Sequence, residues 1–320
     1  MTQDTTAIVA QHLAQAAAAA LPEEVAEKTR LHLLDTLAAM ISGQALKAGI
    51  RARSYVMSYA GAGEGRASLP GTTLWLPPVE AAFAGAMAAH ADETHDSHLA
   101  GRFHPGCAVV PAALAVAEHR GLSGAALLRG IAAGYDVGAR ATLALGYSGP
   151  RTGTHSTHCL GANFGAAAAA ATLAGLDARH CEHALSYATQ QASGIAYWQR
   201  DHEHVEKAFD FGGMGARNGV FAALFVASGA SGCDGALTGP HSYLSAFAER
   251  ADPGALTDGL GQQFEIMRGS IKKWCVGGAA RDHARRPAAH RRWPRHARYL
   301  SATSAGDCAD RWGGELCQLP

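Results

Sequence analysis

Ala- and Gly-rich segments of helical periodicity follow one another along this chain, and they limit the folds that it can adopt. Apolar residues recur at helical spacing over residues 5–20, 23–43, 79–91, 109–121, 124–146, 155–175, 178–194 and 202–229. The last segment reads as one long helix or two abutting ones, and residues 45–78 are mixed, with Gly and Pro punctuation. Alternating strand patterns are scarce before residue 270, so we predict a mainly α fold with short loops between consecutive helices.

Composition narrows the class of protein. The chain has 320 residues, of which 48% are hydrophobic, enough for one large domain or two smaller ones. Positive and negative residues balance, so nothing favours a nucleic-acid partner or a membrane surface. The seven cysteines form no C-x-x-C pair, which favours reduced thiols in a cytoplasmic protein. We expect neither a signal peptide nor a transmembrane helix.

The densest polar cluster lies between residues 90 and 106. It holds His90, Glu93, His95, Asp96, Ser97 and His98, followed by His104 in a His-Pro-Gly step. Such residues can serve as general acids and bases, and a solvated surface loop is the alternative. A metal site at His95, Asp96, His98 and His104 is a further alternative, although the spacing fits no common motif.

A second polar group precedes the apolar segment that begins near residue 157. His155, Ser156, Thr157 and His158 lie where a helix would present unpaired N–H groups, which suits a carboxylate ligand. Ordinary N-capping by Ser156 or Thr157 is the alternative. No dinucleotide fingerprint, P-loop or G-x-S-x-G elbow is present, which removes the usual cofactor and nucleophile signatures.

Taken in order, these clusters resemble the signatures of the MmgE/PrpD family over residues 5–279. The matching segments are HADETHDSH with HPG, GYDVGAR, GTHSTHCLGANFGAAAAAATLAGLD, QQASG, EKAFDFGGMGARNGVFAALFVASGASG and IKKWCVGG. Members include 2-methylcitrate dehydratase, cis-aconitate decarboxylase and iminodisuccinate epimerase. The resemblance therefore implies a cytoplasmic homodimeric lyase or isomerase that acts on a small di- or tricarboxylate without a metal or organic cofactor.

The resemblance also implies the site residues. The catalytic set is His104, His155, Lys207 and Lys272, and the substrate-binding set is Glu93, Asp96 and Ser97. His155 is the implied leading acid/base with His104 as its partner, while His158 competes with His155 and Lys273 with Lys272. The lysines would hold carboxylates, and Glu93 or Asp96 would orient a histidine or bind a hydroxyl group.

The family pattern implies a large helical domain over residues 1–269 and the start of an α/β lid domain over residues 270–279. Residues 280–320 contain eight Arg and no Lys and show no helical or strand periodicity. We interpret them as a frameshifted or disordered tail outside the family pattern, so that the lid domain is largely missing; a basic tail that binds nucleic acid is the alternative. An inactive helical remnant that binds a carboxylate or dimerises, and a His-rich metalloprotein, are the alternative functions.

Overall fold

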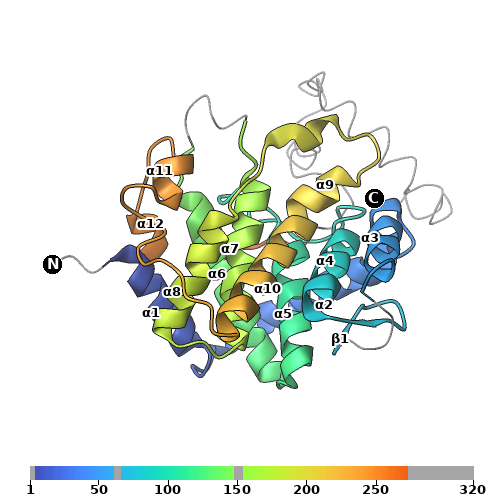
Figure 1. The fold of residues 1–320 in the computed structure, drawn as a ribbon, viewed down its shortest axis with the longest axis horizontal. Coiled ribbons are helices and arrows are strands. Elements are labelled where there is room, and N and C mark those ends of the chain that lie inside the picture. Colours follow the sequence, from blue (N-terminus) through green and yellow to red (C-terminus); the bar gives the residue numbers. More distant parts are fainter. Residues whose placement is uncertain (1–3, 61–65, 148–153, 273–320) are drawn as a thin grey trace.

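The computed structural model describes residues 4–60, 66–147 and 154–272, and this part of the chain is mainly α-helical (Figure 1). The predicted fold class is confirmed. The elements are α1 (Thr5–Ala16), α2 (Glu23–Gly43), α3 (Lys47–Met57), β1 (Ala67–Ser68), β2 (Trp75–Leu76), α4 (Pro78–Ala89), α5 (Gly106–Arg120), α6 (Gly124–Leu143), α7 (Thr157–Leu173), α8 (Ala178–Gln190), η2 (Ala196–Arg200), α9 (Glu206–Ala208), η3 (Phe209–Gly213), α10 (Met214–Ala227), α11 (Tyr243–Phe247), α12 (Gly254–Thr257) and η4 (Glu265–Arg268).

Helix α7 forms the centre of the molecule. Nearly every residue from Thr157 to Leu173 is buried, because α5, α6, α8 and α10 all pack against this helix. A helix that is apolar on all sides is stable only inside such a layer of other helices. Figure 1 shows α6, α7 and α10 together in the middle of the bundle, with α1 and α8 on one side and α2, α3 and α4 on the other.

Glycines allow α6 and α7 to cross with their backbones in contact. A Cβ atom at Gly138 would lie 2.7 Å from the carbonyl oxygen of Gly161, and one at Gly165 would lie 2.8 Å from that of Gly134. Both distances are too short for a side chain, so this crossing requires residues without one. The same applies where α10 crosses α7, because a Cβ at Gly219 would lie 2.4 Å from the backbone nitrogen of Ala167.

The remaining elements cover this core. Helix α4 packs against α2, α3, α5 and α10, and the short hairpin of β1 and β2 lies beside α5. The hairpin pairs Ala67 with Leu76 and Ser68 with Trp75 in antiparallel register. Among the described residues, no helix is both long and apolar enough to cross a membrane.

The helix boundaries agree with the sequence pattern at some positions and differ at others. The second predicted helix matches α2, and Gly121 ends α5 in the left-handed conformation with a φ of 64°. The first helix ends at Ala16 instead of residue 20. Helix α3 lies in the region read as mixed, and it buries Ala48, Ala52 and Val56 at helical spacing. The predicted domain boundaries at residues 269 and 279 stay predictions, and the segment 280–320 lies outside the described residues.

Candidate functional site

Polar side chains from distant parts of the chain meet beside the C-terminal end of α4. They come from the α4–α5 connection, the start of α7, the region of α9, and residue 272. In Figure 1, η2 and α9 lie along the upper edge of the bundle, above α4. The group, called the histidine–lysine cluster below, consists of His90, Glu93, His95, His104, His158, His204, Lys207 and Lys272.

Glu93 is the anion of the cluster and is surrounded by cations. The Lys207 ammonium group donates to Glu93 Oε1, and Lys272 Nζ donates to the backbone oxygen of Glu93 at 2.8 Å. Burial opposes ionisation of Glu93, but the charges of Lys207, Lys272 and His204 outweigh it and lower the pKa of the carboxyl to about 2. Burial lowers the pKa of Lys272, so a further anion beside it would stabilise its charged form, and the two lysines therefore suit an anionic ligand.

Lys207 is positioned by an irregular stretch of helix. Its backbone N–H donates to Asp201 Oδ2 at 2.8 Å, and its Nζ lies 5.2 Å from the ring centroid of Trp198 and 5.3 Å from that of Phe211. Between α9 and α10 the chain forms one π-helical segment, Phe209–Gly213. Such π turns inside α-helices are frequent at functional sites. The segment that precedes α9 is tied to α3 by the exposed pair of Lys47 Nζ and Glu203 Oε1, 3.1 Å apart.

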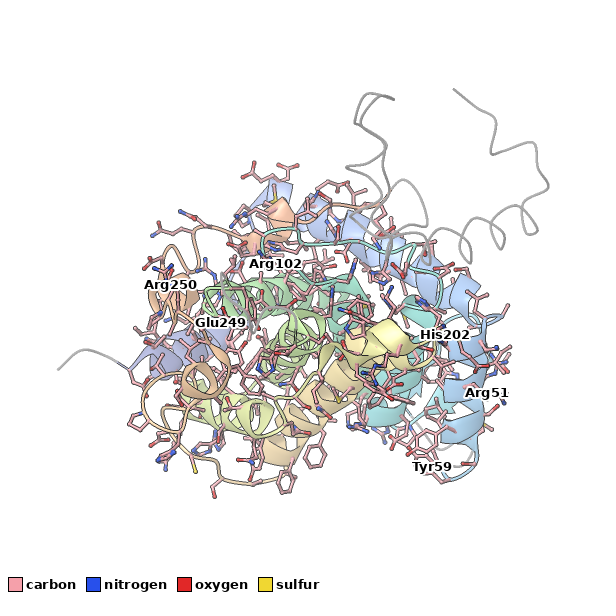
Figure 2. All side chains as sticks on the ribbon, turned by 90° about the horizontal axis from the view of Figure 1, so that it is seen from above. Arg51, Tyr59, Arg102, His202, Glu249 and Arg250 are labelled. Atoms are coloured by element: carbon pink, nitrogen blue, oxygen red, sulfur yellow. The ribbon has the colours of Figure 1, made fainter. Side chains whose placement is uncertain are left out.

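Figure 2 shows the edge of the molecule at which this segment lies. His202 lies at the rim beside α9, and Arg51 of α3 lies further along the same edge. The entrance to α9 is thus near the surface, whereas Lys207 itself is buried.

Two histidines with lowered pKa values lie next to the lysines. The ring of His158 stacks on Phe211, with centroids 3.7 Å apart, and on His104 at 5.2 Å. Burial and the charge of Lys207 lower the pKa of His158 to about 3, and burial and Lys272 hold that of His104 well below its usual value. Both rings are therefore neutral at pH 7 and can accept a proton.

The tautomer of neutral His104 is fixed by its hydrogen bond. Its Nδ1 lies 2.6 Å from the backbone oxygen of Asp96. A carbonyl oxygen only accepts hydrogen bonds, so Nδ1 carries the proton and Nε2 keeps its lone pair. Nε2 is therefore the atom of His104 that can accept a proton.

A further pair of histidines lies deeper in the cluster. His90 Nδ1 and His95 Nε2 are 2.6 Å apart, close enough to share one proton. His204 stacks on His90 with centroids 5.3 Å apart, and its Nε2 donates to the backbone oxygen of His90 at 3.1 Å. Burial lowers the pKa of all three rings, most strongly that of fully buried His90. The lysines are therefore the main source of positive charge in the cluster.

Asp96 lies behind the cluster and is completely buried. Its Oδ2 accepts from His32 Nδ1 and from the hydroxyl group of Tyr135, each at 2.7 Å, and its Oδ1 accepts from the backbone N–H of Gly106 at 3.0 Å. Burial opposes the charge, yet the hydrogen bond from His32 and the nearby ring of His95, whose Nδ1 lies 3.8 Å from Asp96 Oδ1, hold the pKa of Asp96 far below its usual value. Its carboxylate is engaged by protein donors and is buried away from solvent.

The structure places the predicted site residues in three locations. Glu93, His104, Lys207 and Lys272 belong to the histidine–lysine cluster. Asp96 and Ser97 are buried behind it, where Ser97 forms backbone hydrogen bonds with Ser270 at 2.9 and 2.8 Å.

His155 lies apart from these residues. It forms an isolated β-bridge with Ile195, and its ring contacts Phe247 at 5.5 Å. Of the two histidines that the sequence leaves open in this segment, His158 is the one that reaches His104.

Sequence reasoning did not identify His32, Tyr135, Trp198 and Phe211 as parts of the site. His32 interrupts an apolar stretch of α2, and Tyr135 lies in GYDVGAR, a segment noted only as a family match. A polar side chain at a position where the helical spacing predicts a buried face was the signal available for both. Trp198 and Phe211 carry no comparable signal, because aromatic residues near a turn are common.

Within the part of the chain that the structure describes, two groups of donor atoms lie close enough together to be considered for a metal ion. They are His90, His95 and Cys107, and His90, Glu93 and His204. In the first group the two imidazole nitrogens already lie at hydrogen-bonding distance, and in the second Glu93 is paired with Lys207. These contacts favour hydrogen bonding over metal binding. His98, a ligand in the predicted metal set, instead lies 3.0 Å from Glu265 Oε2.

Comparisons with known proteins bear on the same residues. The family model described as the MmgE/PrpD N-terminal domain matches residues 7–255. That range contains every member of the histidine–lysine cluster except Lys272. A search of curated proteins finds no match.

Proposed function

Because the chain belongs to the MmgE/PrpD family, we propose that it is a cofactor-independent lyase or isomerase acting on a small di- or tricarboxylate. The reaction would begin with proton transfer from a carbon atom next to a carboxylate. A 2-methylcitrate dehydratase-like reaction and an epimerase-like reaction both fit this description.

One observation carries the proposal: neutral histidines lie beside two buried lysines. Lys207 and Lys272 both contact Glu93, and His104 and His158 stack on each other next to them. A carboxylate ligand adds negative charge near these rings, which raises their pKa values toward the range in which a histidine is an effective base. Substrate binding would therefore raise the pKa values of His104 and His158 and make them stronger bases.

The chemistry follows from these residue types. A histidine removes the proton from the carbon next to a substrate carboxylate, and the electron pair of the C–H bond moves into that carboxylate as an enediolate. Lys207 and Lys272 stabilise the added negative charge. The enediolate then either expels a β-hydroxyl group, which takes the proton from the histidinium and leaves as water to give an alkene, or takes a proton on its other face from a histidinium to give the epimer.

We assign proton transfer to His104 and His158 and carboxylate binding to Lys207 and Lys272. The fixed tautomer of His104 and the stacking of both rings on or beside Phe211 support this assignment. Glu93 competes with the substrate for Lys207 and so favours release of the product. The carboxylate of Asp96 is engaged by His32, Tyr135 and the backbone N–H of Gly106, so we do not assign it to substrate contact, whereas the role of Ser97 stays a prediction.

The test is solvent exchange of substrate protons in D2O, followed by proton NMR, with 2-methylcitrate, citrate, cis-aconitate and iminodisuccinate. We expect one of these acids to lose a C–H signal next to a carboxylate and to raise the unfolding midpoint. A ligand at 100 times its dissociation constant adds about 2.7 kcal/mol to the free energy of unfolding. A rise in midpoint without exchange or turnover would instead mean a protein that only binds carboxylates.

Two histidine variants of the same segment provide a matched pair. His158→Gln is expected to slow exchange by about 100- to 10,000-fold, the usual contribution of a general base. His155→Gln is expected to leave the exchange rate within about twofold of the wild type, because His155 contacts Phe247 instead of the cluster. Full exchange in both His104→Gln and His158→Gln would overturn the assignment of the bases.

A further inference from the structure

The buried carboxylate of Asp96 connects three helices to the loop that carries His104. Its donors are His32 of α2, Tyr135 of α6 and the backbone N–H of Gly106, the first residue of α5. The rings of His32 and Tyr135 meet edge to face, with centroids 5.3 Å apart. Three donors from three elements fix both the place and the orientation of this carboxylate.

The chain leaves no spare room around this carboxylate. A Cβ atom at Gly106 would lie 2.6 Å from Thr36 Oγ1, 2.8 Å from Asp96 Oδ1 and 3.0 Å from the hydroxyl oxygen of Tyr135. The start of α5 can approach Asp96 only because residue 106 has no side chain.

Asp96 and Gly106 bracket His104 in the sequence, and their hydrogen bond closes the loop between them. Within this loop, His104 Nδ1 donates to the backbone oxygen of the same Asp96 at 2.6 Å. The side chain of Asp96 is therefore held by the helices, while its carbonyl group holds the ring of His104. Because the carboxylate and the carbonyl group belong to the same residue, a backbone shift that follows the loss of a carboxylate donor would move the oxygen atom to which His104 Nδ1 donates.

We propose that His32 and Tyr135 are positioning residues, which hold Asp96 so that its carbonyl group keeps the proton on Nδ1 of His104 and leaves Nε2 free. The effect on catalysis rests on the proposed function, whereas the effect on the tautomer does not. His32 and Tyr135 hydrogen-bond to Asp96, and their rings contact each other. They act through Asp96.

A purely structural role makes a different prediction. If these residues only stabilised the fold, their replacement would lower the free energy of unfolding and leave the His104 tautomer and the exchange rate per folded molecule unchanged. The tautomer of His104 is therefore the decisive measurement.

The test uses the full chain labelled with 15N histidine and long-range proton–nitrogen NMR, with the His104 signals assigned by their loss in His104→Gln. In the wild type we expect a protonated Nδ1 and an unprotonated Nε2. Tyr135→Phe removes one donor to Asp96 and is expected to convert these signals into an average of both tautomers. Tyr243→Phe is the matched control, since this equally buried tyrosine donates to Ala141 O at 3.1 Å, and it is expected to leave the His104 signals unchanged.

A second pair of variants covers the possibility that Tyr135→Phe does not fold. The side-chain nitrogen of an asparagine can take the place of histidine Nδ1, so His32→Asn is expected to retain the wild-type tautomer while His32→Leu loses it. For the variants that lose the tautomer, the exchange rate at saturating substrate is expected to fall by about 10- to 100-fold with little change in KM.

The outcomes separate the two proposals. Wild-type His104 signals in both folded Tyr135→Phe and folded His32→Leu would overturn the positioning role. If those variants alter the tautomer while the wild type exchanges no proton of any tested acid, the positioning role stands and the proposed function fails.

Discussion

Replacing Lys207 by Met should reverse the pH dependence that Glu93 gives to folding. In the wild type the folded pKa of Glu93 is about 2, below the ordinary value of 4.5, so its stabilising effect is present above pH 4.5 and is lost as the pH falls toward 2. Without Lys207, only Lys272 and His204 act against burial, and we expect the folded pKa to rise above 4.5, so that the variant loses stability as the pH rises above 4.5. The two proteins should thus diverge between pH 5 and pH 7.

The size of the effect has an upper limit. The variant can always protonate Glu93, and this costs about 1.4 kcal/mol for each unit by which the pH exceeds 4.5. This cost to the variant is therefore at most about 3.4 kcal/mol at pH 7 and about 0.7 kcal/mol at pH 5, so the unfolding free energies of the two proteins should move apart by up to about 2.7 kcal/mol over this range. Breaking a buried ion pair costs about 3–5 kcal/mol, so the limit should nearly be reached at pH 7.

Urea denaturation of both proteins at pH 5, 6 and 7 measures the difference in unfolding free energy. Lys47→Met is the matched control, because Lys47 pairs with Glu203 on the surface and both side chains are more than half exposed. Its effect should stay below about 1 kcal/mol at each pH. The reasoning would be refuted if the destabilisation by Lys207→Met did not change with pH. It would also be refuted if the double variant Glu93→Gln/Lys207→Met were no more stable at pH 7 than Lys207→Met.

Two further predictions concern the helical core. Burial raises the pKa of Asp136 to about 7, so protonated Asp136 stabilises the fold below pH 3.8, and this effect is lost as the pH rises through 7. The unfolding free energy of Asp136→Asn should therefore rise relative to that of the wild type by up to about 4 kcal/mol between pH 4 and pH 8. A difference that stays constant with pH in urea denaturation would contradict this. Gly138→Ala places a methyl group 2.7 Å from the Gly161 oxygen and should cost about 1–3 kcal/mol, whereas Gly124→Ala on the same helix meets nothing within 4 Å and should be neutral or stabilising. Equal melting temperatures for the two glycine variants would contradict the close crossing of α6 and α7.

The helical fold could be predicted because its signals are local. Apolar spacing and terminal glycines or caps marked α2, α5 and α8, and those helices lie close to the predicted ranges. Helix α3 was missed because charged Arg residues and nearby glycines obscure its short apolar stripe of Ala48, Ala52 and Val56. The π turn has no local signal, since its hydrogen bonding depends on packing against other helices.

The site was predictable only in part, because contacts between distant parts of the chain decide which side chains meet. The lysines and His104 follow from motif positions, but whether His155 or His158 faces His104 depends on where α7 begins. That register is set by non-local contacts: the pairing of His155 with Ile195 and the hydrogen bond of Ser156 with Asp210. His32 and Tyr135 reach Asp96 only through the packing of α2 and α6, which the spacing of residues along one helix does not reveal.

Because of the π turn at Phe209–Gly213, the direction in which Lys207 points is independent of the direction in which the residues of α10 point. One additional residue in a helical turn rotates everything before it by about 100° relative to everything after it. Lys207 can therefore face Glu93 while Gly215 and Gly219 of α10 face the α7 backbone. If one residue were removed from this turn, either Lys207 would keep its contact with Glu93 or Gly215 and Gly219 would keep their contact with α7, but not both. The length of this segment is therefore as constrained as the identity of the residues on either side.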